Sequence, residues 1–320
     1  MKFPKTFLIF LLALITSWAQ ADAWPSRPIR FVVAAPGGSS LDIIARILGD
    51  KLKERLGQSI VIDNIPGASG TIATNNVAKA SADGYTLLMS YNGPLAFTQF
   101  LTKLPYDPQK DLAPVIQTSS QPNVLAINAN LPVKNVEELI AYAKKHPGKL
   151  NYASVGNGSS SHLTMELFKS MTSTHIVHIP YNGAPPAALS TASGDTQVIF
   201  SVPSVVMAHI KSGKVKALAV TGSARFPLLP DLPTVAESGL PKFESMTWNG
   251  VLVPHGTPPE IIHRLNREID AVLKLPEVKA RLNTAGLEPA GGSAEAFKTL
   301  IASEAKKWSE IIRKTGATLD

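Results

Sequence analysis

The chain has 320 residues, 44% of them hydrophobic and 17% charged, which predicts a folded protein with a large apolar core. Its 31 Lys and Arg exceed its 24 Asp and Glu, giving a formal charge of +7, but the basic residues are scattered and not clustered with aromatics. This pattern argues against nucleic-acid binding. The chain contains no Cys, which excludes disulfides and a lipid-modified N-terminal cysteine.

Residues 1–23 have the pattern of a secretory signal peptide. Two lysines precede an apolar run over residues 7–15, and two A-x-A cleavage sites follow within residues 19–23. The run is shorter than the roughly 20 apolar residues that span a bilayer, so an uncleaved anchor is the weaker alternative. We therefore expect an exported protein whose mature chain begins near Trp24 and suffices for one large or two medium α/β domains.

The mature chain opens with a strand, a glycine-rich turn and a helix. Residues 29–35 are largely β-branched or aromatic, residues 36–38 (Pro-Gly-Gly) break the strand, and Ser39 is a suitable N-cap with Asp42 in capping-box register. Apolar residues then recur on one helix face as far as Leu56. Free amides and the positive end of the helix dipole meet at this turn, so it favours an anion. The same pattern also occurs in turns that bind nothing.

Two further strands, over residues 59–64 and 85–90, alternate with a helix around residues 73–78. Such alternation predicts a parallel sheet with crossover helices. Three loops lie at the carboxyl ends of these strands, at residues 37–40, 67–70 and 91–94. Ligands bind at that edge in open α/β sheets, so we expect a binding site there.

Two extended segments, residues 113–117 and 123–127, have no helix between them and indicate a crossing into a second α/β lobe. A strand over residues 150–153, a Gly/Ser-rich turn over residues 154–161 and a following helix then repeat the opening arrangement. The second turn therefore offers a second helix N-terminus to an anion.

The remaining elements alternate as far as a return strand at residues 245–253, after which three helices are expected, over residues 259–273, 276–284 and 293–313. We expect residues 24–122 and 249–320 to form one lobe and residues 123–248 the other, with crossings near residues 113–127 and 245–253. A cleft between the lobes would close about these crossings as a hinge.

Several motifs follow one another without large gaps: PGGSSLDIIAR (36–46), IPGASG (65–70), ADGYTLL (82–88), YASVGNGSS (152–160), PYNG (180–183), PDLPTVAE (230–237) and WNG (248–250). Together they resemble the substrate-binding receptors of tripartite tricarboxylate transporters, also called the Bug family. The resemblance covers nearly the whole mature chain. It implies a type II periplasmic-binding-protein fold, α/β in class, in which each lobe is a mixed sheet flanked by helices.

The resemblance also implies a function. Such a receptor is expected in the periplasm, where it binds a small organic carboxylate between its lobes and delivers it to large and small integral-membrane transporter subunits. We expect a monomer that needs no cofactor and binds no metal. One departure is Gln197, where the family often has an acidic residue.

The candidate ligand contacts lie in the two turns and at neighbouring strand ends: Gly37, Gly38, Ser39, Ser40, Tyr91, Asn92, Ser154, Gly156, Asn157, Gly158, Ser159, Ser160, Tyr181, Asn182 and Ser201. The resemblance implies that the turns at residues 37–40 and 154–160 hold a carboxyl group of the ligand. Both turns could instead serve only as helix caps. Asp42 is expected to stabilise its helix, and Trp248 to lie in the core.

Other classes of protein are less well supported. The pair His175 and His178 would point to opposite faces of a strand, and no acidic residue joins them at zinc spacing, whereas His162 is expected as a pocket wall or a hydrogen-bonding residue at a helix start. An enzyme is the rival class, but the chain has no nucleophile elbow, P-loop or Rossmann motif. A sensor that signals through a membrane protein would use the same closure and stays open as an alternative.

Overall fold

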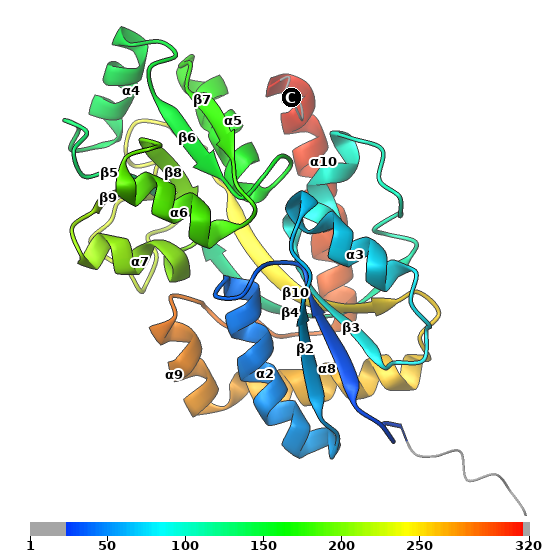
Figure 1. The fold of residues 1–320 in the computed structure, drawn as a ribbon. Helices are drawn as coiled ribbons and strands as arrows, with labels where there is room; N and C mark the ends of the chain where they lie inside the picture. Colours follow the sequence, from blue (N-terminus) through cyan, green and yellow to red (C-terminus); the bar gives the residue numbers. More distant parts are fainter. Residues whose placement is uncertain (1–23, 316–320) are drawn as a thin grey trace, which may run out of the picture.

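A computed structural model describes residues 24–315 of the protein, and the expected signal peptide lies outside this range. The described residues form two lobes, each built on a five-stranded sheet (Figure 1). Within residues 24–315 no helix is long and apolar enough to cross a bilayer.

The first sheet has the order β2-β1-β3-β10-β4, with the strands β1 (Ile29–Val33), β2 (Ile60–Asn64), β3 (Thr86–Tyr91), β4 (Leu112–Pro122) and β10 (Met246–Pro254). Strand β1 pairs in parallel with β2 and β3, as the alternating pattern predicts. Strand β10 instead lies antiparallel between β3 and β4. The expected mixed sheet is therefore confirmed, because the return strand enters the sheet from the other lobe and runs in the opposite direction.

The second sheet has the order β7-β6-β8-β5-β9, with the strands β5 (Val124–Asn128), β6 (Asn151–Ser154), β7 (Val177–Pro180), β8 (Val198–Ser201) and β9 (Val215–Val220). Strand β6 is parallel to its neighbours β7 and β8, whereas β5 is antiparallel to β8 and β9. Both lobes therefore have a mixed sheet whose parallel part carries the strand–turn–helix units.

Helices cover the faces of both sheets (Figure 1). The first lobe carries α2 (Ser40–Leu56), α3 (Thr71–Ala78), α8 (Pro259–Lys274), α9 (Pro276–Thr284) and α10 (Ala294–Thr315). The second carries α4 (Val136–Lys145), α5 (Ser160–Thr172), α6 (Ala184–Ser193) and α7 (Pro203–Lys211). Short turns η1 (Ala68–Gly70), η2 (Gly93–Phe97) and η3 (Thr98–Phe100) complete the first lobe, so the segment after β3 is helical where the sequence suggests an open loop.

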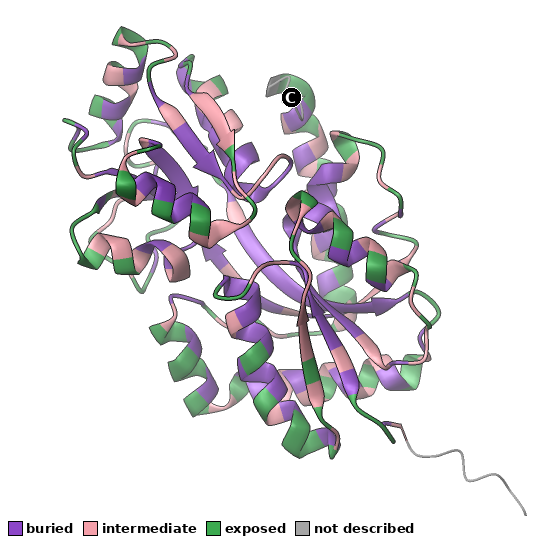
Figure 2. Ribbon diagram, viewed as in Figure 1, coloured by how far each residue is buried: buried purple, intermediate pink, exposed green. Residues whose placement is uncertain are grey.

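The cores follow from the side-chain periodicity of these elements. On α2 the predicted apolar face is buried, including Leu48 and Leu52, while Arg46 and Asp50 are exposed. On β5, alternate residues enter cores on opposite faces of the second sheet, as expected for a strand covered on both sides. Figure 2 shows buried central strands and half-buried helices, whereas the edge strands β2 and β7 are partly exposed.

Two crossings join the lobes. The chain leaves the first sheet at Pro122 and enters the second at Val124, and it returns into the first sheet at Met246, which pairs with Pro122. Trp248 lies next to this point, 1% exposed and edge-on to Phe297 at 5.5 Å between ring centroids. The expectation that Trp248 belongs to the core is confirmed, and its packing fixes the strand that links the lobes.

Candidate functional site

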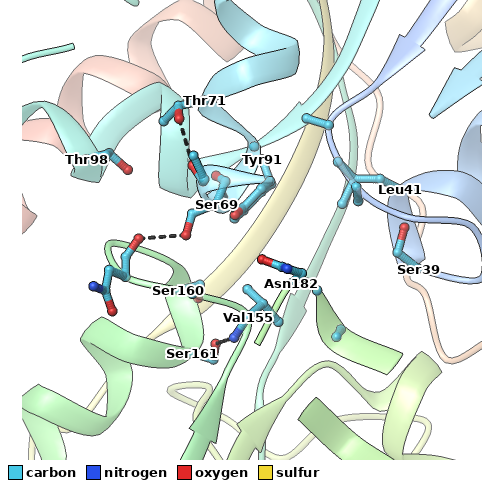
Figure 3. Close-up of a pocket in the computed structure, with 18 of the residues that line it drawn as sticks. Ser39, Leu41, Ser69, Thr71, Tyr91, Thr98, Val155, Ser160, Ser161 and Asn182 are labelled. Atoms are coloured by element: carbon cyan, nitrogen blue, oxygen red, sulfur yellow. Dashed lines mark hydrogen bonds between the residues drawn. The ribbon is translucent and has the colours of Figure 1, made fainter. Parts of the chain in front are cut away.

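A cavity of about 470 Å³ lies between the two lobes. Its walls include the N-termini of α2 and α5, the η1 turn and the ends of β3 and β8, so both lobes contribute (Figure 3). Lys103 is the one charged residue among the described lining residues, and it is exposed. The wall of the cavity therefore carries almost no charge.

The turn before α2 is held by its own side chains. Gly38 has φ +79°, a conformation that glycine adopts without strain, and Ser39 accepts a hydrogen bond from the Asp42 amide at 3.3 Å. The Asp42 carboxylate accepts from the Gly38 amide at 3.0 Å. The predicted N-cap is confirmed, but the acid bonds one residue further back than in a capping box.

The turn before α5 has nearly the same geometry. Gly158 has φ +73°, and Ser159 has φ −77° and ψ 164°, against −74° and 164° for Ser39. Ser159 accepts from the His162 amide at 3.3 Å, and the ring Nδ1 of His162 accepts from the Gly158 amide at 3.1 Å. His162 is thus a hydrogen-bonding residue at the helix start, one of its two expected roles, and it occupies the position that Asp42 holds in the first lobe.

Each cap leaves two helix amides free. In the first lobe the Ser39 side chain accepts from Asp42 and its carbonyl from Ile43. No acceptor within residues 24–315 remains for the amides of Ser40 and Leu41. Both residues line the cavity, so the first lobe has two residues with unoccupied N–H donors at its wall.

The second lobe repeats this arrangement. Ser159 accepts from the amides of His162 and Leu163, which leaves those of Ser160 and Ser161 without an acceptor in the described chain. Ser160 and Ser161 also line the cavity. Two helix N-termini, one from each lobe, therefore place four residues with acceptor-free amides at the wall of one cavity, and each carries the positive end of a helix dipole.

The cap of α2 can be tested by stability. Ser39→Ala removes the acceptor for the Asp42 amide, and we expect the free energy of unfolding to fall by about 1 kcal/mol in chemical denaturation. Ser303→Ala, at an exposed position within α10, is the matched control and should change it by less than about 0.5 kcal/mol. Equal effects of the two substitutions would contradict the capping role.

The charge behind the first turn is ionised and paired. The Asp42 side chain is 6% exposed and contacts the Arg46 guanidinium at 3.0 Å. Burial acts to raise the pKa of Asp42, but the hydrogen bonds from Arg46 and from the Gly38 amide outweigh it and hold that pKa below its usual value. Asp42 does not line the cavity. Its expected role in stabilising the turn and helix is confirmed.

Behind the second turn lies a stack of three rings. His178 lies between Tyr152 and His162, with ring centroids 4.7 Å and 4.4 Å apart. Burial lowers the pKa of His162 to about 4 and that of His178 to about 3, so both imidazoles are neutral at pH 7. The Nε2 atom of His178 lies 2.6 Å from the Ser154 hydroxyl, which also accepts from the Gly156 amide. Neutral histidines thus support both ends of this turn.

The lobes contact each other at the cavity wall. The Ser69 hydroxyl, in the first lobe, donates to the Asn157 carbonyl at 2.6 Å (Figure 3). Elsewhere at the cavity wall, Gly183 of the second lobe approaches Pro36 so closely that a Cβ atom on Gly183 would lie 2.6 Å from the proline Cγ. The two lobes therefore approach each other closely at two places on the cavity wall.

The cavity gathers nine of the fifteen predicted contacts: Ser39, Ser40, Tyr91, Gly156, Asn157, Ser160, Tyr181, Asn182 and Ser201. The other six do not line it: Gly37, Gly38, Asn92, Ser154, Gly158 and Ser159. Most of these six shape the two turns. The Asn92 side chain donates to the Met246 carbonyl at 2.9 Å and so links the end of β3 to the crossing strand.

The sequence reasoning missed lining residues that belong to other segments. Ser69 lies in the second of the three strand-end loops, a position that did carry a signal. Thr247 and Asn249 lie within β10, where polar residues in a buried strand were the sole hint. The Asn249 Oδ1 and Ser201 Oγ atoms are buried and have no partner in the described chain. Such unsatisfied groups in a cavity wall are typical of a ligand site.

The described residues include no group of three or more His, Asp or Glu side chains that could hold a metal ion.

A family model described as the tripartite tricarboxylate transporter family receptor matches residues 44–317. The chain belongs to this family. Its members are solute-binding receptors, a class without enzymatic activity.

Relatives and solved structures agree with this assignment. Protein BugT of Bordetella pertussis is 38% identical over 307 residues, which cover 95% of this chain and 94% of that protein. The structure of R. palustris Rpa4515 with adipate is 37% identical, with a TM-score of 0.90, and the match covers 92% of this chain and 99% of that one. MatC from Rhodopseudomonas palustris with bound malate is 31% identical, with a TM-score of 0.86 over 90% of this chain and all of that one. The expected two-lobed fold and the resemblance to Bug receptors are confirmed.

Proposed function

We propose that this tripartite tricarboxylate transporter family receptor binds a small organic carboxylate in the cavity between its lobes. The observation that carries the proposal is the set of four amides without an acceptor in the described chain, two on α2 and two on α5, whose residues line this space. A carboxylate has enough acceptor sites to bond several N–H groups at once, and a helix N-terminus favours its charge. The adipate and malate bound to similar proteins support a carboxylate ligand.

Closure of the lobes is the second part of the proposal. In an open form the two turns are exposed separately, and a carboxylate that bonds both draws the lobes together. Closure removes water from the site and strengthens each polar contact. The contacts of Ser69 with Asn157 and of Pro36 with Gly183 would then form, and the closed receptor, in the periplasm, would present its ligand to the membrane subunits of a transporter.

The test is isothermal titration calorimetry of the mature protein, residues 24–320, with malate, adipate, citrate and benzoate, each compared with its neutral amide. We expect at least one acid to bind and its amide not to bind, because the site recognises a negative charge. Since the donors are uncharged amides, affinity should change little between low and moderate salt. Failure of every acid to bind, or equal binding of acid and amide, would contradict the proposal.

A further inference from the structure

The two turns that meet at the cavity differ in charge. The cap serines agree closely in φ and ψ, the glycines before them agree in φ, and each turn has one side chain that accepts from the glycine amide. In the first lobe that acceptor is a carboxylate, Asp42, and in the second it is a neutral imidazole, His162. The first turn of α5 contains no acidic residue.

The charges around each turn preserve this difference. Asp42 is 6% exposed, whereas its partner Arg46 is 58% exposed and therefore more strongly screened by solvent. On α5 the charged groups Glu166 and Lys169 pair with each other at 2.7 Å, with side chains 15% and 20% exposed. The second turn therefore keeps the full attraction of its helix N-terminus for an anion, while the buried carboxylate offsets part of that attraction at the first.

We propose that the ligand's carboxylate is held mainly by the second lobe, at Ser160 and Ser161, and that Asp42 is a positioning residue that weakens the first lobe's turn as an anion site. This inference rests on the proposed function. It predicts an order of events, in which the carboxylate binds the second lobe first and the first lobe closes over it. The turn of the first lobe, which binds the carboxylate more weakly, can then lose its contacts first, so that the receptor can reopen and release its ligand.

The first test changes the charge behind each turn and keeps the hydrogen bond. The ligand is malate or adipate, whichever has the higher affinity for the wild type. Asp42→Asn retains an oxygen acceptor for the Gly38 amide, and we expect this variant to bind the chosen acid several-fold more tightly than the wild type does. His162→Asp should weaken binding several-fold, because it adds a buried negative charge at the second turn. His162→Asn, neutral and still an acceptor, is the control for loss of the imidazole ring and should weaken binding less than His162→Asp does.

The second test deletes one free amide from each lobe. Proline is well tolerated at the first position of a helix, and the extended conformation of Ser39 and Ser159 is the one that a following proline requires. Ser160→Pro should therefore weaken binding of the same acid at least several-fold more than Ser40→Pro does. The alanine variants Ser160→Ala and Ser40→Ala keep the amides and correct for the lost hydroxyl groups, including the contact between Ser160 and Thr247.

The outcomes distinguish a failure of the proposed function from a failure of this inference. If no acid binds the wild-type protein, the proposed function fails and this inference with it. If acids bind but Asp42→Asn leaves affinity unchanged or lowers it, or if the two proline variants lose affinity equally, the inference alone is overturned. Thermal unfolding of each unliganded variant shows whether it is folded, and the proline pair decides the question even if His162→Asp does not fold.

Discussion

We expect the Gly183→Ala variant to bind carboxylates roughly 5- to 100-fold more weakly than the wild type, although it folds. The added Cβ atom would lie 2.6 Å from Cγ and 2.9 Å from Cδ of Pro36, which belongs to the other lobe. The third atom near this Cβ is Cδ of Pro185, at 4.0 Å, which belongs to the second lobe like Gly183 itself. The clash therefore exists when the lobes are closed and disappears when they separate, so it raises the free energy of the closed form. Calorimetry with the acid that binds the wild type measures the loss.

Backbone strain must be separated from this clash, because Gly183 has φ +118°. Gly292→Ala is the matched control, since Gly292 has φ +98° and a Cβ there would meet no atom within 4 Å. It should lower stability slightly and leave affinity unchanged. Pro36→Ala should restore much of the affinity when combined with Gly183→Ala, because it removes the two ring atoms that clash. Wild-type affinity in the Gly183→Ala variant would show that closure at this contact is not required for binding.

The parts of the site that the sequence predicts correctly are local. Ser39 and Ser159 cap their helices through residues three positions away, and the glycines before them adopt the conformation of a tight turn. Such geometry depends on the order of a few neighbouring residues. A short pattern such as Gly-Ser-Ser is therefore enough to place a helix start and its free amides.

The parts that the sequence does not predict are contacts between distant segments. The bond from Ser69 to Asn157 joins residues 88 positions apart in two different lobes. Strand β10 enters the first sheet between β3 and β4, and this placement brings Asn249 to the cavity wall. No local pattern encodes how lobes or distant strands meet, so these residues become visible once the fold is known.

Acidification is expected to destabilise the protein through the two stacked histidines. In the unfolded chain their pKa is near 6.5, whereas in the folded protein burial lowers the pKa of His162 to about 4 and that of His178 to about 3. Between pH 6.5 and pH 4 the unfolded chain therefore binds protons that the folded protein does not. Each such proton lowers the free energy of unfolding by up to about 1.4 kcal/mol per pH unit, so this contribution to stability is full above pH 6.5 and is lost as the pH falls.

The measurement is chemical denaturation from pH 7.5 to pH 4, in which the variants His162→Asn and His178→Gln should each show a shallower loss of stability than the wild type. Both keep a polar group for the bonds to Gly158 and Ser154. His263→Gln, at an exposed position on α8, is the control and should leave the slope unchanged. An unchanged slope in both variants would show that other groups cause the acid sensitivity.

The same protonation has a consequence for binding. A proton on Nδ1 of His162 would turn the acceptor of the Gly158 amide into a donor, so two N–H groups would face each other behind the second turn. The turn that presents the free amides of Ser160 and Ser161 would then lose its support. The imidazolium charge would itself attract the carboxylate, but a distorted turn no longer directs these amides at it. Carboxylate affinity should therefore fall from pH 5 to pH 4 in the wild type, the range in which His162, with a pKa of about 4, gains its proton. It should fall less in His162→Asn, whose side chain keeps an acceptor that does not titrate.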